Sequence, residues 1–168
     1  AAGAPPVPKG EKVASQVEGD LNRDGAADLV RITTNDNFEA KVTVFMRLQG
    51  KDLNGKCCMD GYDTVDTLQV DLTPHGPPTA SIKNGVLVIE STTGGSSVRT
   101  TSVYRYRLED GMRLIGLDAE REAPAASIKM SWNLLTGARI VRYGKRDARG
   151  VAWEPEAKSV VKVPPMTM

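Results

Sequence analysis

The sequence predicts a single, mainly β domain of antiparallel hairpins, arranged as a meander, a sandwich or an open barrel, with at most one or two short helices. Three observations favour this class: strand-like runs recur at short spacing, turn-forming dipeptides separate several of them, and all prolines lie outside them. At 168 residues the chain is long enough for one domain with its own core. We place that domain at residues 11–163, between flexible termini at 1–10 and 164–168.

Several segments alternate between apolar and polar residues, as a half-buried strand does. Residues 42–48 do so, and residues 68–72 repeat the pattern. Dipeptides that accept positive φ angles follow or separate such runs and predict tight turns. The predicted hairpins join 81–83 to 86–90 through Asn84-Gly85, 104–108 to 112–117 through Asp110-Gly111, and 134–135 to 139–141 through Thr136-Gly137, with a further turn at Asn54-Gly55.

Helical periodicity is weak along the whole chain. Val13, Ala14 and Val17 form the best candidate for a short helix. Residues 118–126 are charged and contain Pro124, so we interpret them as a loop or a single turn. No tandem repeat with a fixed period occurs, which argues against a propeller or a solenoid.

Charge and hydropathy narrow the possible partners and the location. The chain has 22 Lys and Arg residues and 21 Asp and Glu residues. The resulting net charge of +1 gives little attraction for nucleic acid. No apolar run approaches the roughly 18 residues that a membrane-spanning helix needs. Residues 1–8 are small and proline-rich, typical of a mature N-terminus left by removal of an export signal, although an arbitrary chain boundary would look the same. We therefore expect a periplasmic or secreted bacterial protein, and a lipid anchor before residue 1 is compatible with this.

An acidic loop carries the strongest chemical signal in the chain. Its oxygen-bearing side chains occupy positions one, three, five and nine: Asp20, Asn22, Asp24 and Asp28. Gly25 at position six permits a sharp turn, and the carbonyl of Ala26 at position seven would complete the ligands. Hard oxygen donors suit calcium better than zinc or copper. The alternative is that Asp and Asn only form the turn, with Asp24-Gly25 making a hairpin.

The loop differs from an EF-hand, because position twelve is Arg31 rather than glutamate and a predicted strand follows. It resembles instead the D-x-[DN]-x-D-G-x-x-D loop of FG-GAP and integrin-type repeats, over residues 19–30. This resemblance implies that calcium is bound by the side chains of Asp20, Asn22, Asp24 and Asp28 and by the carbonyl of Ala26. A single copy does not imply a propeller.

A broader resemblance covers most of residues 18–140. Turn and strand positions there are similar to those of uncharacterised bacterial exported proteins, in which one calcium-type loop precedes a β-rich body. The resemblance implies a fold class and an exported location, and no established activity. Relatives of this type often carry cysteines near position 57 with a wider spacing, and the adjacent pair Cys57-Cys58 departs from that pattern.

The adjacent cysteines are unusual in themselves. An ordinary disulfide needs Cα atoms about 4.4–6.8 Å apart, whereas neighbouring residues are about 3.8 Å apart. In a strand, Cys57 and Cys58 would point to opposite faces, which favours one buried thiol and one near the surface. A vicinal or intermolecular disulfide is the alternative. Zinc is not expected, because two adjacent thiols and His75 do not supply four ligands.

No catalytic set is recognisable in the sequence, and we expect no enzyme activity. His75 lies in a rigid proline-rich turn, and no Gly-x-Ser-x-Gly motif surrounds Ser96 or Ser97 as its nucleophile. A second acidic cluster has a spacing of three, which favours a solvated loop over a second metal site: Asp60, Asp63 and Asp66.

One predicted strand presents arginines on one face. Alternate residues of a strand point to the same face, so the odd-numbered positions place Arg99, Arg105 and Arg107 together. The even-numbered positions place Tyr104 and Tyr106 on the opposite face, toward the core. The arginines form either a solvated charged face or a docking surface for an acidic protein partner. The tryptophans of the chain are expected in the core: Trp132 and Trp153.

These observations favour a calcium-stabilised, exported binding or interaction domain without evident catalysis. An inhibitor or immunity protein for a toxin or a hydrolase fits this description, with a protein partner and no nucleic acid. A calcium-dependent periplasmic hydrolase using His75 and a purely structural cell-envelope protein are the alternatives.

Overall fold

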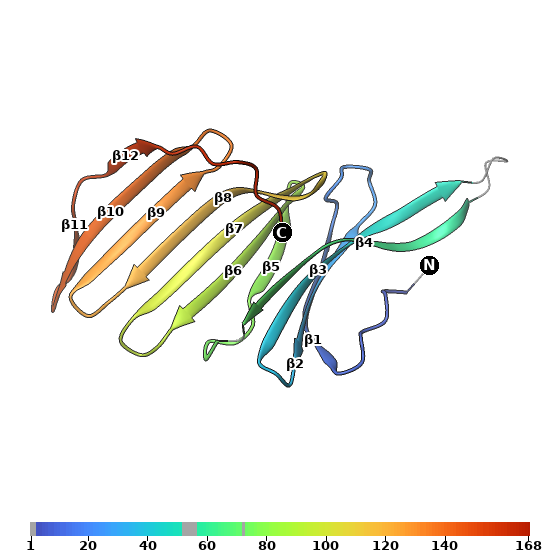
Figure 1. Ribbon diagram of the computed structural model, residues 1–168, viewed down its shortest axis with the longest axis horizontal. Coiled ribbons are helices and arrows are strands. Elements are labelled where there is room, and N and C mark those ends of the chain that lie inside the picture. Colours follow the sequence, from blue (N-terminus) through green and yellow to red (C-terminus); the bar gives the residue numbers. More distant parts are fainter. Residues whose placement is uncertain (1–2, 52–56, 72) are drawn as a thin grey trace.

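The computed structural model shows an all-β chain arranged as two antiparallel sheets that meet near the middle of the molecule (Figure 1). It describes residues 3–51, 57–71 and 73–168, without the side chains of residues 49–51, 57–60 and 71. These residues include no helix, and the predicted mainly β class is confirmed. In this part of the chain nothing resembles a helix long and apolar enough to cross a membrane.

The small sheet is a meander of four strands in sequence order: β1 (Glu11–Gly19), β2 (Asp28–Asn35), β3 (Glu39–Lys51) and β4 (Cys57–Asp71). Every residue of β2 from Asp28 to Thr33 is buried, so this strand is covered on both faces. On the side away from the large sheet, Arg31 donates a hydrogen bond of 2.6 Å to the carbonyl of Pro5 and lies over the ring of Phe45. The N-terminal segment therefore closes part of the outer side of the small sheet.

The large sheet follows as a second meander. Its strands run in the order β11-β10-β9-β8-β7-β6-β5, with β12 paired to β10. Their bounds are β5 (Thr79–Lys83), β6 (Val86–Gly94), β7 (Arg99–Glu109), β8 (Gly111–Glu122), β9 (Ala126–Asn133), β10 (Ala138–Asp147), β11 (Gly150–Trp153) and β12 (Ala157–Val160). The turns between β5 and β6 and between β7 and β8 are the predicted ones, with positive φ at Asn84, Gly85 and Gly111.

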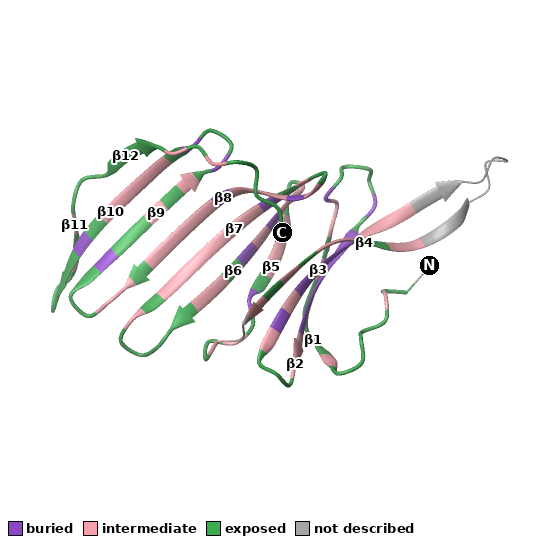
Figure 2. Ribbon diagram, in the orientation of Figure 1, coloured by how far each residue is buried: buried purple, intermediate pink, exposed green. Residues whose placement is uncertain are grey.

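The hydrophobic core lies where the small sheet packs on the β5 to β8 end of the large sheet. Buried residues from both sheets form one cluster, seen as purple segments at the centre of Figure 2: Val30, Ile32, Val42 and Val44 face Leu87, Ile89, Tyr106 and Met112, with Leu21 from the acidic loop. Fully burying one such aliphatic side chain contributes about 1.5–3 kcal/mol. The packing of the two sheets is therefore the main source of stability.

Two contacts join the sheets at the edges of the core. Beside β5, Gly19 at the end of β1 approaches Ile82 so closely that a Cβ atom would lie 2.8 Å from the Cβ of Ile82. On the other side, the Asp66 carboxylate of β4 accepts a hydrogen bond of 3.0 Å from the backbone N–H of Met112 at the start of β8. The contact between β1 and β5 therefore bounds the core on one side, and the contact between β4 and β8 bounds it on the other.

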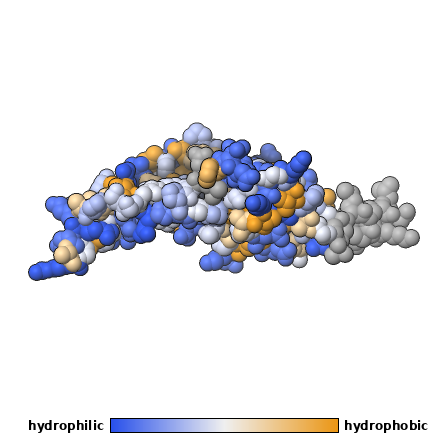
Figure 3. Space-filling model, turned by 90° about the horizontal axis from the view of Figure 1, so that it is seen from below, coloured by the Kyte–Doolittle hydropathy of each residue, from blue (hydrophilic) through white to orange (hydrophobic). Residues whose placement is uncertain are grey.

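The remaining half of the large sheet extends away from this core. Seen from below, the molecule is an elongated, shallow arch, and its β10 to β11 end is mostly hydrophilic (Figure 3). The accessible surface is 10370 Å², against about 8,100 Å² for a compact monomer of 18.1 kDa. The chain is therefore less compact than a globular monomer of its size, as the extended large sheet in Figure 1 shows.

Two predictions about local structure are wrong. The best helical candidate, residues 13–17, lies in β1, where a β-bulge between Val13 and Ser15 interrupts the alternation that would have revealed a strand. Residues 118–122, interpreted as a loop, belong to β8. Their acidic side chains alternate along the strand and meet cations on neighbouring strands, so their charge is compatible with the sheet.

Two further segments also differ from the predicted arrangement. The strand predicted at 134–135 is a turn, because the side chain of Asn133 accepts the N–H groups of Leu135 and Thr136 and ends β9. The C-terminal residues, expected to be flexible, lie along β8, where the Leu114 N–H donates to the Met166 carbonyl at 2.8 Å. The predicted turn at Asn54-Gly55 lies outside the described residues.

The close approach of Gly19 to Ile82 gives a stability test. Gly19→Ala should lower the free energy of unfolding by about 1–3 kcal/mol, because the added methyl group overlaps a packed side chain. Gly61→Ala in β4 is the matched control, because no described residue lies within 4 Å of the position that its added methyl group would occupy. Urea unfolding of the two variants measures the difference, and equal stabilities would contradict this packing.

Candidate functional site

The acidic loop connects β1 to β2, and Gly19 and Asp28 at its two ends are paired across the hairpin. The Asp20 carboxylate accepts the backbone N–H groups of Arg23, Asp24 and Gly25. Arg23 and Gly25 have positive φ angles of 63° and 86°, which turn the chain around this carboxylate. Asp20 therefore organises the backbone of the loop.

Asn22 and Asp24 lie on the exposed side of the loop. The Asn22 Oδ1 accepts the Asp24 N–H at 3.1 Å, and its Nδ2 donates to Asp24 Oδ2 at 2.8 Å. The Ala26 N–H donates to Asp24 Oδ1 at 2.8 Å. The Ala26 N–H, and then the Asn22 amide, hold the pKa of Asp24 below its usual range, so this carboxylate is ionised at neutral pH.

Asp28 occupies the buried side of the loop. It is 0% exposed, and its two oxygens accept the backbone N–H groups of Leu21 at 2.8 Å and Arg47 at 2.9 Å. Among the residues that the structure describes, no cation forms an ion pair with this carboxylate. A buried carboxylate without an opposite charge is unfavourable. The loop therefore holds a negative charge that a bound cation would compensate.

The oxygen donors of this loop have the chemistry of a calcium site, although their geometry is not that of a closed one. Within the described residues, no three His, Cys, Asp or Glu side chains are grouped so as to hold a metal ion. Several of the loop oxygens accept backbone N–H groups instead, as expected for the turn-forming alternative. Calcium would be held by the predicted residues, whose donors are all oxygen: Asp20, Asn22, Asp24, the Ala26 carbonyl and Asp28.

The predicted arginine face belongs to the outer face of the large sheet, which we define as the side turned away from the small sheet. Arg99 pairs with Glu122 at 2.8 Å and Arg105 pairs with Asp118 at 2.7 Å. Arg107 pairs with Glu109. The arginines are on one face, as their parity predicts, but each faces a carboxylate. This surface therefore carries mixed charge rather than a basic stripe.

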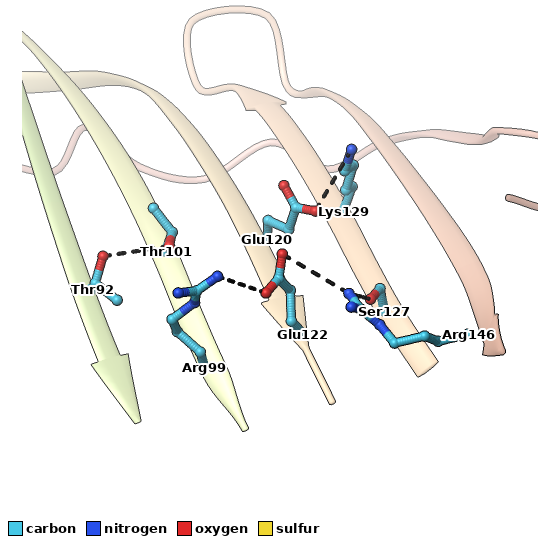
Figure 4. Close-up of polar contacts among 8 residues, drawn as sticks. All are labelled: Thr92, Arg99, Thr101, Glu120, Glu122, Ser127, Lys129 and Arg146. Carbon is cyan, nitrogen blue, oxygen red and sulfur yellow. Dashed lines mark hydrogen bonds and ion pairs between the residues drawn. The ribbon is translucent and has the colours of Figure 1, made fainter. Parts of the chain in front are cut away.

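Cross-strand pairs continue over the outer face, where Figure 4 shows Glu122 between Arg99 and Arg146. Arg146 Nη2 is 4.0 Å from Glu122 Oε1 and donates to Ser127 Oγ at 3.3 Å. One row further along, Lys129 and Glu120 are paired at 3.6 Å. Such exposed pairs contribute only about 0–1 kcal/mol each to stability. Their main effect is to balance the charges of the outer face.

The outer face also holds a shallow groove of about 480 Å³ across β7 to β10. Thr101, Glu120 and Ile140 line it, together with Glu156 from the segment before β12. Both tryptophans, predicted in the core, are half-buried instead. Trp153 is covered by Lys129, whose Nζ is 4.4 Å from the ring centroid, and Trp132 donates to the Val161 carbonyl at 3.0 Å.

His75 and the serines considered as its partners do lie around one cleft, of about 430 Å³, at the end of the large sheet. Ser96, Ser97 and Arg99 share its lining with His75. A nucleophile and its base need hydrogen-bond reach of about 2.6–3.2 Å. Among the described residues, no hydrogen bond joins the His75 ring to either serine. The cleft brings the residues together without forming an activated pair.

The second acidic cluster, predicted in a solvated loop, belongs to strand β4 instead. Asp63 is exposed, whereas Asp66 is engaged by the Met112 N–H. The side chains of Asp60, Cys57 and Cys58 lie outside the described part of the structure, and so do the predictions made for them.

Sequence reasoning missed a third opening, a groove of about 600 Å³ between the two sheets. Tyr104 and Tyr106 line it from β7, opposite Leu68 and Val70 of β4. The only sequence signal was the core-facing parity of the tyrosines. Burial raises the pKa of Tyr106 to about 12, with smaller contributions from Tyr104 and Asp66.

None of the protein-family models, curated proteins or solved structures matches this chain. The assignment of function therefore rests on the residues described above.

The raised pKa of Tyr106 predicts a pH dependence of stability. The native state holds the phenolic proton more tightly than the unfolded chain, whose tyrosine pKa is 10.0. This contribution is fully present below pH 10 and is lost as the pH rises toward about 12. Tyr106→Phe should weaken the fall in urea midpoint between about pH 9 and about pH 11.

Tyr143→Phe is the control for this measurement, because Tyr143 is 52% exposed. It should follow the pH dependence of the unsubstituted protein. If Tyr106→Phe loses stability over this range as steeply as Tyr143→Phe, the native pKa of Tyr106 is not raised.

Proposed function

We propose that the protein is a calcium-stabilised, exported binding domain whose outer sheet face holds a protein partner. The observation that carries this proposal is the exposure of that face. Between β7 and β9, Ser127 and Gly116 are its buried positions, and the remaining side chains are half-buried or exposed. A rigid, uncovered sheet with fixed polar side chains is a surface suited to recognition.

The composition of the outer face supports a protein as the partner. Arginine and tryptophan are enriched among the residues that dominate binding energy at interfaces, and Arg142 and Trp153 lie together here. Alternating cations and anions would select a partner of complementary pattern, and would exclude partners of the wrong pattern. A standard interface buries about 800 Å² on each partner.

Calcium in the acidic loop is supported by the buried Asp28 carboxylate and by the resemblance of the loop to FG-GAP repeats. Calcium would compensate the charge of Asp28 and tie the β1–β2 hairpin to β3, whose Arg47 N–H contacts the same carboxylate. Extracellular and periplasmic calcium suits a loop with such ligands. Its role would be structural, because the loop lies apart from the outer face.

An inhibitor or immunity protein for a toxin or a hydrolase is the form of binding domain that fits best. Such a protein needs a stable scaffold and a patterned surface, and no catalysis of its own. A purely structural envelope protein would present the same scaffold without a specific partner, and the partner experiment below distinguishes the two.

Calcium should raise the melting temperature, because a ligand that binds only the native state stabilises it by mass action. At a hundredfold excess over Kd the expected shift is roughly 5–10 °C. Asp24→Ala should abolish the shift in a thermal unfolding experiment with millimolar calcium. Asp36→Ala, which removes an exposed carboxylate of the β2–β3 turn, should keep it.

Asp28→Ala tests the folding role of the loop. It should destabilise the protein with or without calcium, because two backbone N–H groups lose their acceptor. An unchanged melting temperature of the unsubstituted protein at millimolar calcium would remove calcium from the proposal.

The partner should be retained by the outer face. In a pull-down from the native cell, reversing the charges of Arg99 and Arg105 to Glu should lower the recovery of one specific partner at least tenfold. Arg121→Glu is the control, because Arg121 is exposed on the opposite face of β8. Equal recovery with all proteins would show that the outer face is not the binding surface.

A further inference from the structure

We propose that the groove between the two sheets is a binding site for a small, uncharged, apolar molecule that carries one oxygen acceptor, such as a ketone or an ether. Its volume of about 600 Å³ lies within the range of about 300–1,000 Å³ that is usual for small-molecule sites. The site is separate from the acidic loop and from the outer face, so this inference rests on neither calcium nor a protein partner.

The walls of the groove come from both sheets. Val42, Leu68 and Val70 of the small sheet line one side, and Ile89 and Tyr104 of the large sheet line the other. The remaining described lining is uncharged as well, with hydroxyl and amide groups at Ser91, Thr93 and Gln69. No carboxylate, amine or guanidinium among the described residues lines it. Among these described residues a charged ligand would find no opposite charge to replace its hydration, which favours an uncharged one.

Tyr106 supplies the specific polar contact. It is 5% exposed, and its hydroxyl has no hydrogen-bond partner among the described residues. The only fully enclosed side-chain atom without a partner in that part of the chain is Arg113 Nε. The Tyr106 oxygen is therefore open to the groove that it lines. This accessible hydroxyl is available to a ligand oxygen in the groove, which would take the place of water.

The protonated Tyr106 hydroxyl can donate a hydrogen bond to a ligand. Because the pKa of Tyr106 is raised to about 12, the hydroxyl keeps its proton at neutral pH. It acts as a donor toward a ligand carbonyl or ether oxygen. Apolar walls and one buried donor together define a ligand with an apolar body and a single acceptor.

N-phenyl-1-naphthylamine, an uncharged apolar dye, tests occupation of the groove by its fluorescence. Its binding should weaken at least tenfold in Ser91→Phe, whose ring would fill the groove. Ser131→Phe is the matched control on the outer face and should bind the dye as the unsubstituted protein does. Equal binding by Ser91→Phe and Ser131→Phe, or no binding by the unsubstituted protein, would overturn the site.

Competition against the dye tests the role of Tyr106. 2-Decanone should displace the dye at lower concentration than n-decane, and Tyr106→Phe should weaken the ketone about three- to tenfold while leaving the alkane unchanged. Because Tyr106→Phe removes only an oxygen atom, it preserves the packing of the core. Tyr143→Phe is the control, since its exposed ring lies outside the groove.

Two results would overturn the assignment of the donor. One is an unchanged ketone affinity in Tyr106→Phe. The other is a loss of ketone affinity in Tyr104→Phe alone, which would assign the contact to the neighbouring hydroxyl.

Discussion

The packing of the small sheet against the β5 to β8 end of the large sheet is the contact on which the rest of the structure depends. Apolar side chains of β2 and β3 meet those of β6, β7 and β8 in one buried cluster, while the remaining strands of the large sheet continue beyond it as a single layer (Figures 1 and 2). Gly19 and Asp66 hold the two edges of the contact, one by close approach and one by a hydrogen bond. Because the core lies at one end, the other half of the large sheet extends beyond it.

The two faces of the large sheet consequently carry different chemistry. On the inner face, Tyr104 and Tyr106 line a groove against the small sheet, where low polarity makes a single hydroxyl group important. On the outer face, carboxylates and cations alternate across the strands and remain hydrated. Strand alternation alone produces this division, because neighbouring residues of β7 point to opposite faces. A small apolar ligand and a protein partner could therefore use the same strand without competing.

The acidic loop connects to the same core through its buried side. Leu21 packs in the hydrophobic cluster, and Asp28 joins the loop to β3 through the Arg47 N–H. The exposed side, with Asn22 and Asp24, is satisfied by hydrogen bonds within the loop. A cation bound there would act on the stability of the hairpin and of the core beneath it, since the outer face of the large sheet is remote from it.

Local pattern in the sequence predicted the β class, the turns at Asn84-Gly85 and Asp110-Gly111, and the parity that separates the arginines from the tyrosines, because alternation and positive φ angles depend only on neighbouring residues. The charged strand at 118–122 and the bulged strand at 11–19 were missed. The charged strand is stabilised by partners that are distant in sequence. In the bulged strand, an extra residue breaks the alternation that would have revealed it. Only the tertiary structure decided that Asp28 is buried without a counter-charge among the described residues, that the arginines face carboxylates, and that Tyr106 opens on a groove. Each of these depends on which strands lie opposite one another, and that is set by packing between the sheets rather than by any single segment of the chain.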